Sequence, residues 1–141
     1  MGIMSEQAGI DMLVVGDLVV VTQRSGATSD ASVDRLVTQL SRCRTMLFFS
    51  EGSPSLSSAQ RSRLTKALSD YDIQISAVLN SKLTVGIATA MKWVFPRFGV
   101  FHYDSLAKAF NHIGLTAGDH EAVISALQLL ARRNDMNPPE L

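Results

Sequence analysis

The chain has 141 residues, of which 46% are hydrophobic and 18% are charged. A chain of this length can bury a core large enough to fold alone, so it needs neither a metal nor a disulfide to hold it together. Basic and acidic residues balance at 13 each, which leaves no net charge to attract nucleic acid or anionic lipid. The composition therefore indicates one compact domain and argues against nucleic acid as its partner.

The sequence also indicates the cellular compartment of the protein. Cys43 is the only cysteine and has no second thiol to pair with, so we expect a buried, reduced side chain. Residues 1–11 lack the basic and apolar regions of a secretion signal, and no apolar stretch approaches the roughly 20 residues that span a bilayer. We therefore expect a cytoplasmic protein with no membrane span.

The first predicted elements are a β-hairpin and a helix. Two short apolar runs at residues 12–15 and 18–22 are separated by Gly16-Asp17, a pair suited to a tight turn. Apolar residues then recur with a helical period over about residues 30–42. The stripe of this helix consists of Val33, Leu36, Val37 and Leu40, and Cys43 continues it.

A buried strand and a capped helix come next. Residues 45–50 (TMLFFS) are a continuous apolar run of the kind that is covered on both faces of a sheet. The sequence from Ser57 to Gln60 has the form of a capping box, in which Ser57 accepts from the Gln60 amide and the Gln60 side chain bonds back. The predicted buried stripe of this second helix is Leu64, Ala67, Leu68 and Tyr71.

A fourth strand, residues 73–79, precedes the least polar helix of the chain. This third helix covers residues 83–95 and is ended by Pro96. Gly86 and Ala90 lie four residues apart on it and would let another backbone approach closely. The core positions that we expect in the elements up to this point are Leu36, Leu40, Leu47, Val78, Ile87 and Met91.

The chain then returns to the sheet once more. Residues 99–103 are a fifth short strand, and Asp104 is the predicted N-cap of a helix that ends before Gly114. A last helix begins after Asp119, and we expect residues 134–141 to be a frayed tail. The stripe of the last helix is Val123, Ala126, Leu127 and Leu130.

This order of elements predicts an α/β fold, in which a single domain has a mixed four- to five-stranded sheet flanked by helices. We expect a flexible N-terminus at residues 1–10, the body of the domain at 11–115, an additional C-terminal helix at 116–134 and a flexible tail at 135–141. In such sheets, ligands and partners bind at the carboxyl ends of the strands. Here these ends are followed by residues 50–58 and 79–82.

Several motifs resemble those of the STAS domains and their SpoIIAA-like relatives. They are the hairpin around VVGDLVVVT, the TMLFFSEG strand before a serine-rich loop, and the segment AVLNSKLTVGIATAMKWVFPRFGVFHYDSLAKAFNHIGL. The resemblance covers about residues 11–115. It implies a non-enzymatic module that docks a protein or small ligand and is often phosphorylated at the start of the second helix. Where anti-sigma antagonists of this family have an Asp-Ser-Ser/Thr-Gly pattern, this chain has Ser50-Glu51-Gly52-Ser53-Pro54-Ser55.

The candidate site lies around the first turn of that helix. A phosphate on Ser57 or Ser58 would lie near the positive end of the helix dipole. The simpler interpretation is that Ser57 is an N-cap and the other serines are turn residues. Arg61 and its basic neighbours Arg63, Lys66, Lys82 and Lys92 form either a small basic patch or a solvated face. The candidate partner-binding residues are Ser53, Ser55, Ser57, Ser58, Arg61, Asn80 and Ser81.

We expect no catalytic, cofactor or metal site. His102, His112 and His120 lack HxH or HxxxH spacing, so we interpret them as one strand side chain and two helix-surface residues. The sequence has no G-x-S-x-G, G-x-G-x-x-G or Walker motif. The aromatic residues around Pro96 offer either an exposed platform or, more simply, core residues; they are Trp93, Phe95 and Phe98.

The sequence leaves two main classes of function open. The first is a regulatory or scaffolding module that binds a partner protein, with self-association into a homo-oligomer left open. The alternative is a small domain for an apolar ligand or lipid, suggested by the apolar helix at residues 83–95. A hydrolase with an unrecognised site is a third, weaker class. A large internal pocket would favour a ligand, whereas a filled core with an exposed loop face would favour a protein partner.

Overall fold

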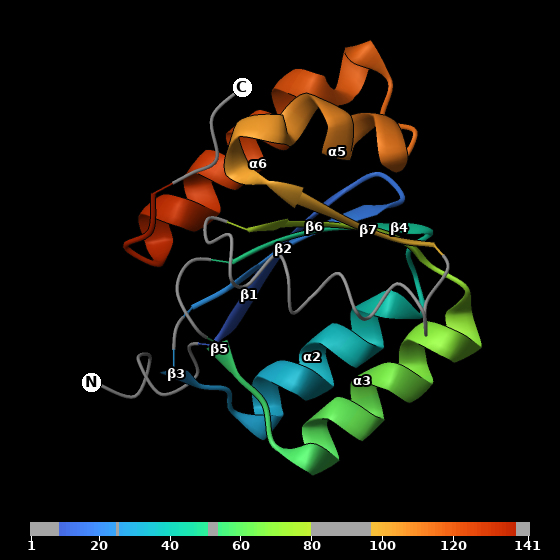
Figure 1. Ribbon diagram of the computed structural model, residues 1–141, viewed down its shortest axis with the longest axis vertical. Coiled ribbons are helices and arrows are strands. Elements are labelled where there is room, and N and C mark those ends of the chain that lie inside the picture. The colour runs from blue at the N-terminus through green and yellow to red at the C-terminus, as the bar shows by residue number, and fades with distance from the viewer. Residues whose placement is uncertain (1–8, 25, 51–53, 80–96, 138–141) are drawn as a thin grey trace.

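The computed structural model describes residues 9–24, 26–50, 54–79 and 97–137. These residues form three layers, in which a five-stranded sheet lies between helices on both faces (Figure 1). The strand order is β1-β2-β4-β6-β7. β1 runs antiparallel to β2, and the remaining neighbours are parallel. The predicted class, an α/β domain with a mixed sheet flanked by helices, is confirmed.

The hairpin consists of β1 (Ile10–Val15) and β2 (Leu18–Gln23). Its two-residue turn needs a positive φ at Gly16, which has φ 59°, whereas Asp17 stays outside the positive region. Glycine first in such a turn is the pattern of type II′, which matches the twist of the strands. The register pairs Val15 with Leu18 and Ile10 with Gln23.

The parallel strands are β4 (Thr45–Ser50), β6 (Gln74–Leu79) and β7 (Phe98–His102). β4 is central, and Leu47 and Phe49 on it are fully buried. Its predicted bounds are confirmed, whereas the other two strands begin or end within a residue of the prediction. Because these strands are parallel, the carboxyl ends of β2, β4, β6 and β7 lie along one edge of the sheet.

One face of the sheet is covered by α2 (Asp30–Leu40) and α3 (Ser58–Tyr71) (Figure 1). α2 ends two residues earlier than predicted, and Cys43 lies buried in the turn that follows. In α3 the predicted stripe holds at Ala67, which is buried, and at Leu64 and Leu68, which are partly buried against the same cluster. It is wrong at Tyr71, which is the last helical residue and is 45% exposed. The cluster on this face includes Val19, Val21, Val33, Leu36, Leu40, Met46 and Ile75.

The other face is covered by α5 (Leu106–His112) and α6 (His120–Arg133). α5 ends as predicted before Gly114, which has φ 69°. The Leu115 amide bonds to the Phe110 carbonyl at 3.0 Å across this end. The cluster on this face includes Leu18, Val20, Leu47, Phe49, Val78, Phe110 and the predicted α6 stripe of Val123, Ala126, Leu127 and Leu130.

The prediction that Asp104 caps α5 is wrong. A 3₁₀ turn, Tyr103–Ser105, precedes the helix, and the cap position is occupied by Ser105 with no side-chain bond to the helix. The Asp104 carboxylate lies 3.0 Å from His102 Nδ1 instead. The hydrogen bond with His102 lowers the pKa of the Asp104 carboxyl. The Asp104 carboxylate is thus bonded to His102, two residues earlier in the chain, and does not cap the helix.

His112 is half-buried and is not the helix-surface residue that was predicted. Its Nε2 atom lies 3.0 Å from the Arg97 carbonyl oxygen, and its backbone carbonyl accepts from Gln74 Nε2 at 3.0 Å. A Cβ atom on Gly99 would lie 2.8 Å from His112 Cδ2. Glycine at this position therefore lets the imidazole lie against β7.

The chain beyond α6 also differs from the prediction of a tail frayed from residue 134. Asn134 is buried, and its Nδ2 atom donates to the Leu130 carbonyl at 2.8 Å and to Asp11 Oδ2 at 3.0 Å. The Thr22 hydroxyl donates to the Met136 sulfur at 3.1 Å. Contacts with β1 and β2 therefore hold the first residues after the helix.

Leu36, Leu40, Leu47 and Val78 are buried as predicted. Ile87 and Met91, together with the predicted helix at residues 83–95 and its Trp93 and Phe95, lie outside the described residues. Phe98 is buried and is not part of an exposed platform. None of the helices within the described ranges has the length and apolar character needed to cross a membrane.

Candidate functional site

The candidate site is the edge of the sheet where the parallel strands end and α2 and α3 begin. A short parallel ladder between β3 (Gly26–Ala27) and β5 (Pro54–Ser55) lies next to this edge. The ladder was not predicted, because two residues per strand are too few to show a period. It joins the segments that lead into α2 and α3, and so brings the starts of the two helices together.

The first turn of α3 forms as the sequence predicts. The Ser57 hydroxyl accepts from the Gln60 amide at 3.1 Å, and Gln60 Oε1 accepts from the Ser57 amide at 2.8 Å. This reciprocal arrangement is a complete capping box. The structural interpretation of Ser57 as an N-cap is confirmed, and its hydroxyl is engaged within the helix.

Gln60 also connects the two helices. Its Nε2 atom donates to the Thr28 carbonyl and to Asp30 Oδ1, at 2.8 Å each. The Thr28 hydroxyl in turn accepts from Gln23 Nε2 at 2.9 Å, at the carboxyl end of β2. These groups are buried except for Asp30. Sequence reasoning missed Thr28 and Asp30 because they lie 32 and 30 residues from Gln60.

Ser58 and Arg61 are exposed on the same turn. The Arg61 guanidinium donates to the Leu56 carbonyl at 2.8 Å and to the Ser58 hydroxyl at 3.1 Å. These bonds hold a positive charge at the end of the helix that already carries the positive pole of its dipole. Within the described ranges no carboxylate forms an ion pair with Arg61.

The other predicted members of the basic patch are paired. Arg63 forms an ion pair with Asp34 of α2, and Lys66 pairs with Asp70 at 2.8 Å. The hydrogen bond with Asp70 raises the pKa of Lys66. Both pairs are exposed, so each contributes little stability. The patch is therefore reduced to Arg61 among the described residues, since Lys82 and Lys92 lie outside them.

The structure brings only part of the predicted site together. Ser57, Ser58 and Arg61 lie on one helical turn, and the Ser55 backbone lies in the adjacent ladder. Ser53, Asn80 and Ser81 lie outside the described residues. The Ser50 hydroxyl at the end of β4 is buried and has no hydrogen-bond partner among the residues described. In the same part of the chain, no group of three or more His, Cys, Asp or Glu side chains has the arrangement of a metal site.

A scan against protein-family models finds no family that matches this chain, and a search of the curated proteins finds no relative. The fold class rests on the structure itself, and the STAS and SpoIIAA-like resemblance stays a proposal.

Proposed function

We propose that the chain is a non-enzymatic, cytoplasmic regulatory or scaffolding module of the STAS-like type, which binds a partner protein through the first turn of α3. The observation that carries this proposal is the exposed Ser58–Arg61 pair at a helix N-terminus. The Arg61 charge is held in place by two hydrogen bonds and has no matching carboxylate among the described residues. The capping box closes this turn within α3, and the Gln60 bonds to Thr28 and Asp30 hold it against the start of α2.

The chemistry of the turn favours an acidic group on the partner. The amides of the first helical turn and the Arg61 guanidinium both interact favourably with a carboxylate or phosphate. A phosphate on Ser58 itself would lie beside Arg61 and occupy that position, which supports a phosphorylation switch at Ser58. Ser57 is a poorer phosphoacceptor in this proposal because its hydroxyl already caps the helix.

The test is capture of partners from the native organism with the full chain as bait. We expect Arg61→Glu to lose a partner that the wild type captures, and Ser58→Glu to weaken it, while both keep the circular dichroism of the wild type. Lys66→Glu makes the same charge change as Arg61→Glu five residues further along α3 and serves as the control. Equal capture of the same proteins by all variants would rule out this surface.

Mass spectrometry of the bait shows whether Ser58 carries phosphate. An unmodified Ser58 together with loss of binding in Arg61→Glu would indicate a constitutive contact with no switch. The apolar-ligand alternative depends on residues 83–95, which lie outside the described residues, and no described contact favours it.

A further inference from the structure

Among the strands that the structure describes, β1 lies at one edge of the sheet, and half of its backbone groups face away from β2. The Arg24 amide bonds to the Gly9 carbonyl at 2.9 Å, so Gly9 and Arg24 are a hydrogen-bonded pair. Such pairs alternate along an antiparallel ladder, and the register makes residues 11, 13 and 15 hydrogen-bonded to β2. The amides and carbonyls of Ile10, Met12 and Val14 therefore point outward.

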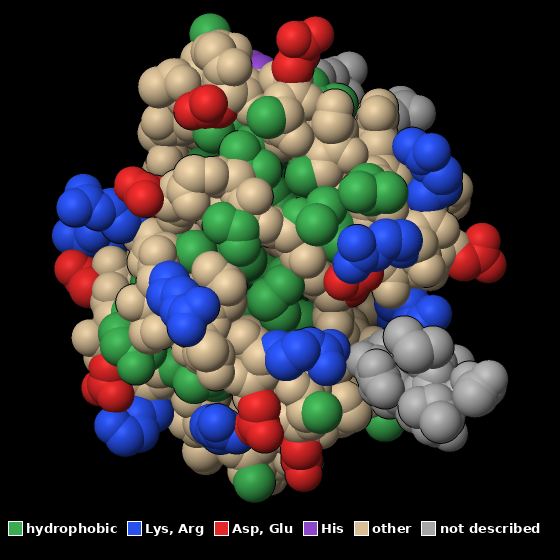
Figure 2. Space-filling model, turned by 180° about the vertical axis from the view of Figure 1, so that it is seen from behind, with side chains coloured by type: hydrophobic (Ala, Val, Ile, Leu, Met, Phe, Trp, Pro, Cys, Tyr) green, Lys and Arg blue, Asp and Glu red, His purple; other side chains and the backbone are tan. Residues whose placement is uncertain are grey.

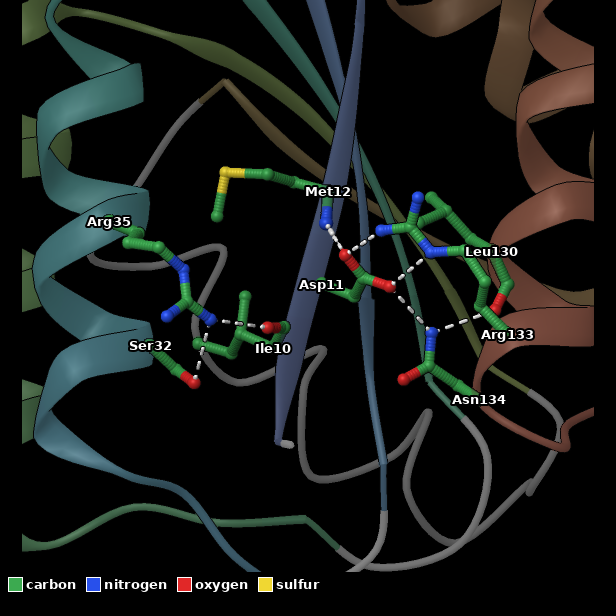
Figure 3. A network of polar contacts seen from close by, with 8 residues as sticks. All are labelled: Ile10, Asp11, Met12, Ser32, Arg35, Leu130, Arg133 and Asn134. Atoms are coloured by element: carbon green, nitrogen blue, oxygen red, sulfur yellow. Dashed lines mark hydrogen bonds and ion pairs between the residues drawn. The ribbon is translucent and has the colours of Figure 1, made fainter. Parts of the chain in front are cut away.

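Side chains occupy two of these outward groups (Figure 3). Arg35 Nη2 of α2 lies 3.4 Å from the Ile10 carbonyl oxygen and 3.4 Å from the Ser32 hydroxyl. The Met12 amide donates to Asp11 Oδ1 at 2.9 Å. An approaching strand would need both of these groups for its own ladder, so each contact competes with strand pairing.

α6 holds the Asp11 carboxylate in this position. Arg133 donates to both carboxylate oxygens, from Nε at 3.0 Å to Oδ2 and from Nη2 to Oδ1, and the Asn134 amide adds a bond at 3.0 Å. Charge-assisted bonds in this two-pronged geometry fix orientation as well as position. Arg35 reaches the strand from the layer of α2 and Arg133 from the layer of α6, so both layers contribute to the same edge (Figure 3).

The second half of the strand has no such cover from a described side chain. Val14 is 50% exposed, and its outward amide and carbonyl have no hydrogen bond to any described residue. The space-filling view shows the rear side of the molecule relative to Figure 1. Hydrophobic side chains gather across the middle of that side, with charged side chains around them (Figure 2). An apolar edge of this kind favours pairing with another strand.

We propose that Asp11, Arg35, Arg133 and Asn134 form an edge latch, which prevents β1 from pairing with the β1 strand of a second copy of the chain. The latch covers the outward groups of Ile10 and Met12. A two-fold antiparallel pair of β1 strands that uses the outward groups of Ile10, Met12 and Val14 is centred on Met12 and places Ile10 opposite Val14 of the second copy, so it needs the latched groups. Opening the latch therefore converts a protected edge into a self-association site.

The test compares molecular mass with protein concentration by sedimentation equilibrium. Wild type is expected to stay monomeric, whereas Asp11→Ala, which frees the Met12 amide and releases Arg133, is expected to shift toward the dimer mass as concentration rises. Arg133→Ala is expected to shift in the same direction by a smaller amount because Asn134 still holds Asp11. Arg132→Ala removes the neighbouring exposed arginine of α6 and should stay monomeric.

A second substitution shows whether the association uses this edge. Val14→Pro removes an outward amide and breaks no bond to β2, and proline is tolerated on edge strands in this orientation. Asp11→Ala combined with Val14→Pro should return to the monomer mass. The proposal is overturned if Asp11→Ala stays monomeric, if the double variant associates as strongly as Asp11→Ala, or if wild type is a dimer that Val14→Pro dissociates. Aggregation of a misfolded Asp11→Ala would also count against it, since Val14→Pro would not reverse it.

Discussion

Gln60 is the residue on which the geometry of the candidate site most depends. Its side chain donates to the Thr28 carbonyl and Asp30 and accepts from the Ser57 amide. We expect Gln60→Ala to lower the free energy of unfolding by roughly 1–3 kcal/mol, because it leaves buried polar groups unpaired. Urea denaturation followed by circular dichroism measures this, with the exposed neighbour Ser62→Ala as a control that should change stability by less than about 0.5 kcal/mol.

Gln60→Glu is expected to lower the free energy of unfolding by an amount that depends on pH. The carboxylate keeps the acceptor for the Ser57 amide but loses both donors and lies beside Asp30, so the like charge raises the pKa of Glu in the folded state. A pKa raised by folding stabilises the folded protein at low pH, and this contribution is lost as the pH rises through the folded-state pKa. The loss in the free energy of unfolding relative to wild type should therefore become smaller as the pH is lowered from 7 to 5. A deficit that stays constant over this range would show that Asp30 and residue 60 do not interact.

These residues also show how far the sequence predicts the site. Ser57 and Gln60 are three residues apart, so their capping box follows from local spacing alone. The bonds from Gln60 to Thr28 and Asp30 depend on how α3 packs on α2, which no local pattern contains. Asp104 has the right residue type and position for a cap, but His102 two residues earlier competes for its carboxylate.

At the scale of elements, α6 offers two adjacent leucines in different surroundings. Leu130 is fully buried against the sheet, whereas Leu129 is 41% exposed. We expect Leu130→Ala to cost roughly 2–5 kcal/mol in the free energy of unfolding, because it leaves a cavity in the cluster on this face. Leu129→Ala in the same helix removes the same atoms from a partly solvated position. Urea denaturation of the two variants should differ clearly, and equal costs would contradict the placement of this helix.

Elements with a long apolar pattern were predicted well, whereas features fixed by distant contacts were not. The continuous apolar run Thr45–Ser50 and the helical period of the α6 stripe are patterns that the sequence displays directly. Tyr71 continues the period of α3 yet is exposed at the last residue of the helix. Asn134 is held by Asp11, which lies 123 residues away in the sequence. Such contacts depend on strand order, which the periodicity of single elements does not determine.

For the whole molecule, the structure predicts that α6 is required for folding. Five residues of α6 are buried in the cluster on the α5 and α6 face, namely Val123, Ala126, Leu127, Leu130 and Ala131. Removal of α6 would therefore expose β1 and β2 on that side of the sheet. A chain ending at Leu115 is therefore expected to lose its cooperative urea transition. A chain ending at Asn137 is the control and should unfold like the full chain. A monomeric, cooperatively folded product ending at Leu115 would contradict the prediction.

The distance along the chain between β1 and α6 has a consequence for synthesis. Asp11 and Arg133 are 122 residues apart, and at about 5–20 residues per second a ribosome needs roughly 6–24 s to add the residues between them. During that interval the hairpin exists without the helix that covers its face and holds its carboxylate. Neighbouring nascent chains on one messenger RNA carry the same uncovered strand at the same time. The synthesis of α6 thus determines when β1 stops being available to them.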